Sequence, residues 1–448
     1  MDPANQRDNP HIQAGSRFSD TRTMNATAES SRHVDEDRLR DDIETNGEYG
    51  AISIGEGHGR TVLPGTKANQ QVREYFVERL EDAGLDVRTD SVGNIAGRWV
   101  PDGADPDAAA VAAGSHLDSV PEGGIFDGVL GVYSALEAVR ALQESDADLD
   151  RPVEVVCFTE EEGTRFSNGV LGSAVATGQR SVDDALALED HDGVSLDDAL
   201  TEIGAKGSGQ LDASAWDSWL EVHVEQSKRL EKANVPVGIV SSITGTIRCS
   251  VEIDGEANHA GCAAMKDRTD ALAAASELVL DVEQATEDVV AEKGDSVVGT
   301  VGQLDISPNA VNVVPGRAEL GIDIRDVDYE SMETIVGEVE ASLARLETER
   351  GVDTTFERPY DIAPIDMSDR CTSALDEAAA ESGVSTMELH SGAGHDTMHV
   401  AKVTDSGMIF APSRDGISHN PLEWTDWESC ATATRVLTGG IARLARSA

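Results

Sequence analysis

The chain has 448 residues, with 35 Lys and Arg against 84 Asp and Glu, and a formal net charge of −49. A surface this negative repels nucleic-acid phosphates and anionic membranes, which argues against a general binder of either. Hydrophobic residues make up 39% of the chain in short periodic runs, so the charge does not indicate wholesale disorder. We expect two or three domains and a protein adapted to high salt, where screening relieves the self-repulsion.

The cysteines and the composition of the N-terminus indicate the cellular compartment of the protein. The five cysteines are irregularly spaced and form no C-x-x-C motif, which excludes a disulfide framework or a thiolate zinc site. No run approaches 18 apolar residues and the start of the chain is polar, so we expect a cytoplasmic protein with no membrane span or signal peptide. Residues 1–35 lack a periodic apolar face and are predicted to be a disordered leader, with a start at Met24 as an open alternative.

An α/β pattern follows the leader. In chain order it predicts a helix over 69–83, strands over 85–88, 94–98 and 108–113, a helix over 129–142, and strands over 153–158 and 220–224. Alternating buried strands and helices predict a mostly parallel sheet covered on both faces, with ligands at the carboxyl ends of its strands. The acidic stretch 179–217 is expected to be irregular, short-helical surface.

A different pattern occupies the middle of the chain. It predicts strand 247–253, helix 271–282, strands 296–304 and 318–325, helix 332–346 and strand 354–356. This β-α-β-β-α-β order is typical of a ferredoxin-like unit. The α/β pattern resumes at 372–382, so the unit is inserted. We therefore predict a catalytic domain of residues 36–245 plus 362–448 and an inserted domain of residues 246–361.

The first candidate site follows the predicted strand 108–113, in the stretch HLDSVPEGGIFDG that begins at His116. A neutral imidazole and a carboxylate are ligands that a borderline divalent cation prefers. Asp118 is close enough in sequence to hold the other ring nitrogen of His116. The glycines allow a tight backbone that turns Asp127 back toward His116. Taken alone, such a loop is also compatible with an ordinary turn.

Three carboxylates, Glu160, Glu161 and Glu162, directly follow the predicted strand 153–158. A solvated surface is the simplest reading of an acidic triplet. At the end of a buried strand, however, adjacent carboxylates repel each other unless a cation neutralises them. One carboxylate can then ligate the metal while its neighbour acts as general base on an activated water.

Further histidines complete a possible metal centre. In EVHVEQ, His223 and Glu225 alternate onto one face of a strand, and GHD contains His395. In SRDGISHNP, His419 lies in a Gly/Ser/Asn loop that suits a positioned ligand better than a core residue. A bridging carboxylate flanked by another carboxylate and histidines would make a two-metal hydrolytic site.

The inserted unit carries polar residues of another kind. His259 lies in NHAG and Asn312 in NAVNVVPG, and both side chains can donate to a developing oxyanion. Arg325 ends the predicted strand 318–325 and can grip a carboxylate through two parallel hydrogen bonds. Each of the three residue types, taken alone, more often has a structural role.

Together these motifs resemble the hydantoinase/carbamoylase family of amidases, within the M20 clan of metallopeptidase-like hydrolases. The matching stretches are GSHLDSVPEGGIFDG, EEEGTRF, EVHVEQ, NHAG, NAVNVVPG, DIR, GAGHD and GISHNP, in family order from about residue 60 to 425. The resemblance implies a metal-dependent exopeptidase-like catalytic domain with an inserted ferredoxin-like lid and dimerisation domain. The sequence departs from the family at CAAM after NHAG, which leaves the side-chain preference open.

The resemblance also implies a role for each residue. By position, the metal ligands are His116, Asp127, Glu162, His223 and His419, with Asp127 bridging; Glu161 is the general base; Asp118 orients His116; and Gln226, His259, Asn312, Arg325 and His395 bind substrate. Counting back from Gly163 makes Glu160 a bystander.

The implied activity is hydrolysis of the ureido C–N bond of N-carbamoyl-L-amino acids to amino acid, carbon dioxide and ammonia. Two divalent ions per subunit are implied, with zinc favoured over manganese, cobalt or nickel, in a homodimer whose substrate carries a carboxylate. Allantoate amidohydrolase and β-ureidopropionase remain alternatives. An M20-type peptidase or deacylase and a non-catalytic binding module are remoter ones.

Overall fold

The computed structural model describes residues 29–53, 57–167 and 169–446. The chain divides into two compact units: Met1–Ile239, Asp369–Met387 and Thr404–Ala448 form the first, and Val240–Ser368 with Glu388–Val403 form the second. The segment 388–403 thus belongs to the second unit, whereas the sequence interpretation assigned it to the catalytic domain. Within the described part of the chain, no helix is both long and apolar enough to cross a bilayer.

A mixed sheet forms the centre of the first unit. Its strands are β1 (Asp86–Thr89), β2 (Ile95–Trp99), β3 (Val111–His116), β4 (Val153–Phe158), β5 (Ser218–Val224) and β15 (Ser406–Ala411). The order is β1-β2-β4-β3-β5-β15, and the sheet continues into β6 (Val237–Ile243). The strands β4, β3, β5 and β15 run parallel, while β1 and β2 are antiparallel additions at one edge. The predicted α/β fold is confirmed, and its parallel part carries the candidate site.

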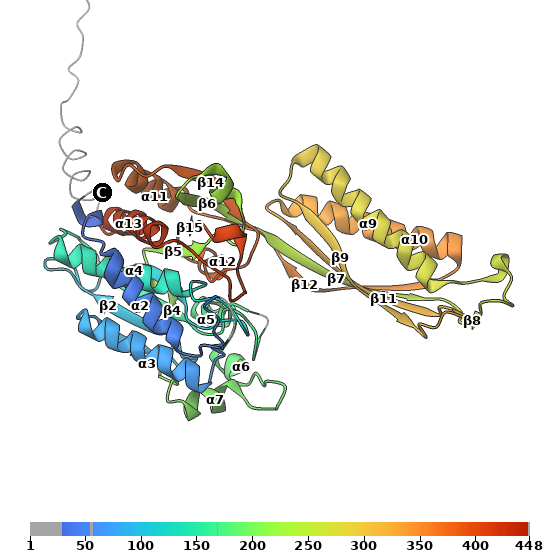
Figure 1. Cartoon of the computed structure of the whole chain (residues 1–448), viewed down its shortest axis with the longest axis horizontal. Coiled ribbons are helices and arrows are strands. Elements are labelled where there is room, and N and C mark those ends of the chain that lie inside the picture. Colours follow the sequence, from blue (N-terminus) through green and yellow to red (C-terminus); the bar gives the residue numbers. More distant parts are fainter. Residues whose placement is uncertain (1–28, 54–56, 168, 447–448) are drawn as a thin grey trace, which may run out of the picture. The chain divides into compact units, whose positions relative to one another are not determined.

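The helices of the first unit are α2 (Glu36–Glu48), α3 (Lys67–Asp82), α4 (Val129–Glu144), α5 (Leu171–Ala176), α6 (Val182–Leu186), α7 (Leu196–Glu202), α8 (Arg229–Ala233), α11 (Asp369–Glu381) and α13 (Trp427–Leu444), with 3₁₀ turns at Ala213–Ala215 and Arg414–Gly416. Of these helices, α3, α4, α5, α11 and α13 pack against the sheet. Helix α4 is apolar almost all round because it packs between β3, β4 and β5 on one side and α2 and α13 on the other (Figure 1). The residues of α4 and the alternate residues of these strands form one large core.

The second unit is a four-stranded antiparallel sheet with two long helices on one face (Figure 1). Its elements are β7 (Gly245–Asp254), α9 (Ala271–Lys293), β9 (Val298–Ser307), β11 (Arg317–Asp326), α10 (Tyr329–Arg350) and β12 (Asp353–Ile362). The order β12-β7-β11-β9 confirms the predicted ferredoxin-like unit.

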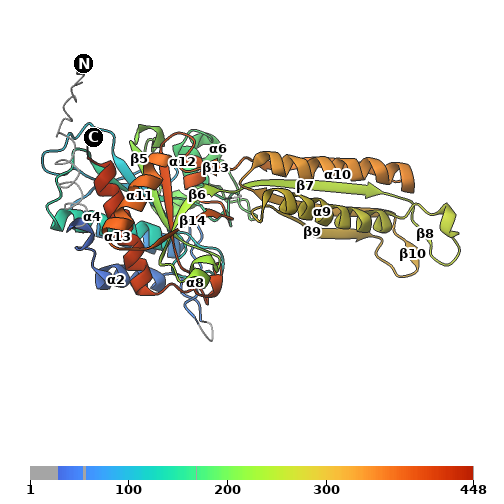
Figure 2. The same cartoon turned by 90° about the horizontal axis from the view of Figure 1, so that it is seen from above.

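Short elements complete the second unit. They are β8 (Asn258–His259), β10 (Val313–Val314), β13 (Ile365–Asp366), β14 (Thr386–Ser391), α12 (Thr397–Val400) and a 3₁₀ turn at Met265–Asp267. The β8–β10 pair lies at the end of the sheet toward which β7 runs (Figure 2).

The predicted leader needs a correction. Residues 1–28 lie outside the described part of the chain, but residues 29–35 pack against the first unit. Ser31 is buried, and its hydroxyl donates a hydrogen bond of 3.0 Å to the backbone oxygen of Arg435. The backbone N–H of Asp35 donates to Glu137, 2.8 Å away in α4. The prediction of disorder up to residue 35 is therefore wrong for residues 29–35, because these polar side chains find partners inside the fold.

Candidate metal centre

The two buried histidines of the site stand at the carboxyl ends of adjacent parallel strands. His116 is the last residue of β3, and His223 is the penultimate residue of β5. Asp127 lies in the loop that leads from β3 into α4. Gly128 adopts a φ of 69°, and a Cβ there would lie 2.4 Å from the His116 ring. Only glycine therefore lets the backbone pass under this imidazole and present Asp127.

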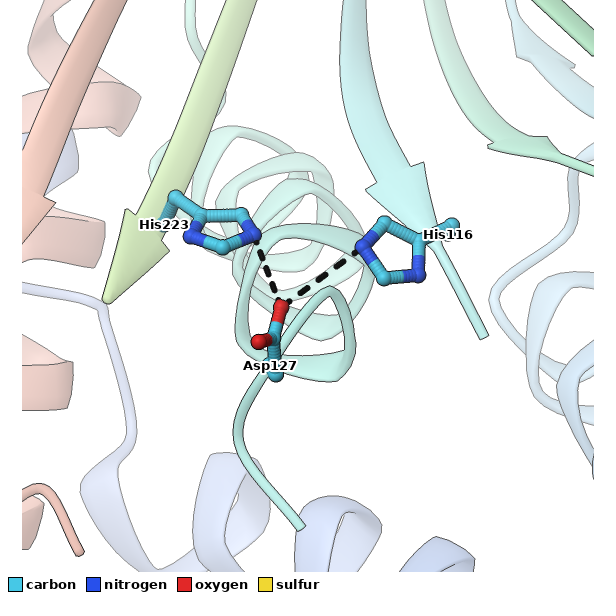
Figure 3. Close-up of side chains that lie close together, drawn as sticks. All are labelled: His116, Asp127 and His223. Carbon is cyan, nitrogen blue, oxygen red and sulfur yellow. Dashed lines mark ion pairs between the residues drawn. The ribbon is translucent and has the colours of Figure 1, made fainter. Parts of the chain in front are cut away.

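One carboxylate oxygen joins the first cluster. The Oδ1 atom of Asp127 lies 3.0 Å from Nε2 of His223 and 3.7 Å from Nε2 of His116 (Figure 3). All three side chains are buried. The Nε2 atom of His116 has no hydrogen-bond partner among the described residues. A buried imidazole nitrogen without a protein partner, aimed at a carboxylate, fits a metal ligand.

The other oxygen of Asp127 joins a second cluster. Its Oδ2 atom lies 3.3 Å from Nε2 of His419, which in turn lies 3.2 Å from Oε2 of Glu162. The Oε1 atom of Glu162 is buried and also has no hydrogen-bond partner in the described structure. Half of the His419 side chain is exposed, which leaves this side of the cluster open. Both clusters have the donor types of a borderline divalent cation, and they share Asp127.

Burial and mutual charge set the protonation of these groups. Burial lowers the pKa of His116 to about 4, which keeps its imidazole neutral and able to ligate. Burial also lowers the pKa of His223, but the Asp127 carboxylate outweighs this effect and raises the pKa to about 9. Burial and then the negative charge of Asp127 hold the pKa of Glu162 well above its usual range. A cation would relieve this crowding of carboxylates.

Glu161 and Asp118 lie directly beside the first cluster. The Oε2 atom of Glu161 is 3.5 Å from Nε2 of His116. Asp118 lies closer to His116 through its backbone oxygen, 3.1 Å from Nδ1, than through its carboxylate, 3.8 Å away. The two carboxylate oxygens of Asp118 instead accept the backbone N–H groups of Glu161 and Glu162, at 3.3 and 3.2 Å. Asp118 therefore fixes the acidic loop as well as the ring.

Glu160 is turned away from both clusters. It is fully buried, and its Oε1 atom accepts the backbone N–H groups of Arg165, Phe166 and Ser167 at 3.0, 2.7 and 3.3 Å. The carboxylate thereby closes the loop that carries its two neighbours. The roles of Glu161 as base and Glu162 as ligand stay predictions from the family resemblance, and both side chains lie beside histidines of the clusters.

The predicted substrate-binding residues fall into separate groups. In the first unit, Gln226 donates a hydrogen bond of 3.1 Å to Oδ2 of Asp127. In the second unit, His259 is exposed on β8, and the backbone oxygen of Asn312 accepts the N–H of Ala260 at 2.9 Å. His259 and Asn312 are therefore neighbours at the β8–β10 end.

Arg325 and His395 lie elsewhere in the second unit. An Nη atom of Arg325 donates to the backbone oxygen of Gly392 at 3.1 Å. His395 is buried, with Nε2 2.8 Å from the hydroxyl of Ser391. Along β11, the eight steps from Arg317 to Arg325 rise about 27 Å at the spacing of an antiparallel strand. Arg317 is at the β8–β10 end, so the two groups lie at opposite ends of one sheet.

The sequence reasoning missed three residues around the clusters: the buried Arg60 and Glu423 and the partly buried Ser418. Ser418 donates to Oδ2 of Asp127 at 2.7 Å, and Glu423 accepts the backbone N–H of Asp127 at 3.0 Å. Arg60 donates to the backbone oxygens of Gly124 and Leu117. Ser418 and Glu423 lie close to His419 in sequence, but no spacing pattern indicates that they contact Asp127. No local pattern indicates that Arg60 lies near the site.

Comparison with known proteins identifies relatives over most of the chain. The family model described as peptidase family M20/M25/M40 matches residues 112–443. An N-carbamoyl-L-amino-acid amidohydrolase of Paenarthrobacter aurescens is 37% identical, covering 85% of this chain and 92% of that protein. An allantoate amidohydrolase of Bacillus subtilis is 35% identical, covering 91% and 97%. The crystal structure of a hydantoinase/carbamoylase family amidase from Burkholderia multivorans has a TM-score of 0.85 at 32% identity, covering 92% and 98%.

Proposed function

This chain belongs to peptidase family M20/M25/M40, and we propose that it hydrolyses the ureido C–N bond of N-carbamoyl-L-amino acids. It is a hydrolase of non-peptide C–N bonds, as its amidohydrolase relatives are named. The observation that carries the proposal is Asp127, whose two carboxylate oxygens face two separate imidazole-containing clusters. This is the ligand arrangement that a two-ion hydrolytic centre needs.

Two divalent ions are expected at these clusters. His116, Asp127 and His223 would hold one, and Asp127, Glu162 and His419 the other. Imidazole and carboxylate donors favour zinc, and manganese, cobalt and nickel suit the same set. When bound, the ions polarise the ureido carbonyl and lower the pKa of a water molecule toward about 7.

Proton transfer falls to Glu161. Its side chain is about 10% exposed, so it can reach a water at the edge of the first cluster while remaining in a mostly desolvated position. Glu161 takes the proton of the attacking water and then returns it to the leaving amine, so the carboxylate ends the cycle unchanged. Asp118 holds the backbone of Glu161 in place throughout.

The residues of the second unit supply substrate contacts in this proposal. Arg325 grips the α-carboxylate, and His259 and Asn312 donate to the oxygen of the carbonyl under attack. Within one chain, Arg325 lies at the opposite end of the sheet from His259, a distance far longer than an N-carbamoyl amino acid. One small substrate therefore cannot contact both groups of the same second unit.

A homodimer resolves this separation. We propose that the β8–β10 end of one subunit completes the site of its partner. Two side chains at that end, Val311 and Met265, are 103% and 77% exposed, which suits a surface covered by another subunit. Strand β9 is an edge of the sheet and exposes Val298 and Leu304, so it offers backbone groups and apolar side chains to a second copy.

Two further proposals concern the setting of the enzyme. All five cysteines are free, which agrees with a reducing compartment, and we place the enzyme in the cytoplasm. The net charge of −49 supports adaptation to high salt.

The experiment that tests the function is ammonia release in high salt with added divalent metal. The substrates are N-carbamoyl-L-amino acids, their D-forms, β-ureidopropionate and allantoate. Turnover of the L-carbamoyl compounds is expected. Turnover of allantoate alone would overturn the substrate assignment in favour of the second candidate, which the B. subtilis relative supports.

A further inference from the structure

Glu423 is a buried carboxylate that the proposed reaction does not use. It is 1% exposed and follows His419 by four residues. Its Oε1 atom accepts the backbone N–H groups of Phe126 and Asp127, at 2.9 and 3.0 Å. Its Oε2 atom lies 2.9 Å from the hydroxyl oxygen of Ser418. One carboxylate therefore joins the loop of Asp127 to the loop of His419, almost 300 residues apart in sequence.

Ser418 extends this connection to the bridging carboxylate itself. Its hydroxyl lies 2.7 Å from Oδ2 of Asp127, the oxygen that faces His419. His419 has a φ of 53°, in the left-handed region that residues other than glycine rarely adopt. Such a conformation persists only where the surroundings hold it. The contacts of Ser418, the residue immediately before His419, supply that restraint.

The protein is built closely around the Glu423 carboxylate. A Cβ at Gly124 would lie 2.3 Å from Oε1 of Glu423, so glycine at this position leaves room for the carboxylate against the backbone. Arg60 is fully buried and donates to the backbone oxygen of Gly124 at 3.1 Å. Burial lowers the pKa of Arg60, and the negative charge of Glu423 opposes this lowering.

We propose that Glu423 is a positioning residue for the second cluster: it fixes Asp127 and His419 together so that this cluster binds its ion. The inference rests on the two-ion centre of the proposed function. Both clusters use Asp127, but the first takes its two histidines from the ends of β3 and β5, whereas the second takes His419 from the loop that Glu423 joins. Loss of Glu423 should therefore weaken the ion of the second cluster more than that of the first.

The test is a count of bound zinc on the full chain, combined with calorimetric titration of the apoprotein with zinc. We expect two tight ions in the wild type. In Glu423→Ala, one ion should remain tight and the other should bind at least 10-fold more weakly, in line with losing an outer partner of metal ligands. Glu428→Ala, an exposed glutamate in the same part of the chain, is the matched control and should bind as the wild type does.

Two further variants separate hydrogen bonding from simple damage to the fold. Gly124→Ala pushes the carboxylate aside without removing it and should reproduce the selective loss; Gly337→Ala, where an added Cβ meets nothing within 4 Å, is its control. Glu423→Gln keeps an acceptor for the two backbone N–H groups and a donor toward Ser418, so it should restore most of the second site.

The outcomes are distinct. Two ions of wild-type affinity in Glu423→Ala, or equal weakening of both, would overturn the positioning role. A wild-type chain that holds fewer than two ions overturns the two-ion centre and this inference with it. A wild-type chain that holds two ions but releases no ammonia contradicts the proposed function alone.

Discussion

The candidate metal residues and the candidate substrate residues are held in very different ways. In the first unit, His116, Asp127 and His223 are buried and tied to strand ends and loops by short hydrogen bonds. In the second unit, His259 is exposed on a two-residue strand. The first arrangement is complete within its own unit. In the proposed dimer the second becomes a site only when the partner subunit meets it, so metal binding and substrate binding should respond differently to mutation.

The largest expected effect separates the base from the ligands. Glu161→Gln should reduce kcat by roughly 10²–10⁴-fold because the amide cannot accept the proton of water. Metal content measured beside ammonia release should stay at the wild-type value, whereas Glu162→Gln should lose an ion. Loss of metal in Glu161→Gln would show that the two carboxylates are assigned in the wrong order.

Complementation tests whether the two ends of the second unit serve different subunits. His259→Ala and Arg325→Ala should each lower turnover by roughly 10²–10³-fold, the usual cost of a lost oxyanion or anchoring contact. Mixed and re-associated, the two variants should recover about a quarter of wild-type activity, because half of the dimers are mixed and one of their two sites is intact. Ammonia release before and after mixing measures this.

A mixture that stays inactive, although native mass spectrometry shows mixed dimers, would contradict a site shared between subunits. The matched control is Arg40→Ala, an exposed arginine on α2 of the first unit, which should leave turnover unchanged.

Metal removal should destabilise the first unit alone. Without cations, the carboxylates of Asp127 and Glu162 remain close together and buried. The folded state also loses the stabilisation that a bound ion provides, which is about 2.7 kcal/mol when the free ion is at a hundredfold excess over its Kd. Chelation should therefore lower the unfolding temperature of the first unit by several degrees. Hydrogen exchange of β3 and β5 should rise while that of β7 and β11 is unchanged. Equal changes in both units would contradict this.

Salt should act on both units. Lowering salt from molar to millimolar concentration should reduce the unfolding temperature, since it unscreens the net charge of −49. Thermal unfolding followed by circular dichroism at several ionic strengths measures this. An unfolding temperature independent of salt would contradict salt adaptation.

The effect with the narrowest origin, a single residue, is a pH dependence carried by the second unit. Burial lowers the pKa of His399 to about 4, whereas the unfolded chain protonates this residue near its ordinary value of 6.5. The free energy of unfolding is therefore highest above pH 6.5, where His399 is neutral in both states. It decreases as the pH falls toward 4, by up to about 3 kcal/mol. In His399→Gln, the denaturation midpoint should depend less on pH over this range. An unchanged slope would assign the dependence to other groups.

The local pattern of apolar residues in the sequence was sufficient to predict much of the fold. The run 153–158 matches β4 residue for residue, because continuous apolar and β-branched side chains suit a strand buried on both faces. The order of elements from β7 to β12 was likewise predicted. Helix α2 and residues 29–35 were missed, because their burial depends on contacts with α4 and α13 that no local period reports.

The sequence by itself determined the chemistry available: imidazoles and carboxylates placed after buried strands, in an order that matches a known family. Only the tertiary structure decided that the two oxygens of Asp127 face different histidines. It also decided that the Asp118 carboxylate binds backbone N–H groups of the acidic loop, and that Glu423 joins two distant loops. The reason is physical. Side-chain periodicity reports neighbours within a helix or strand, whereas a buried hydrogen bond between segments hundreds of residues apart exists only once the sheet has brought them together.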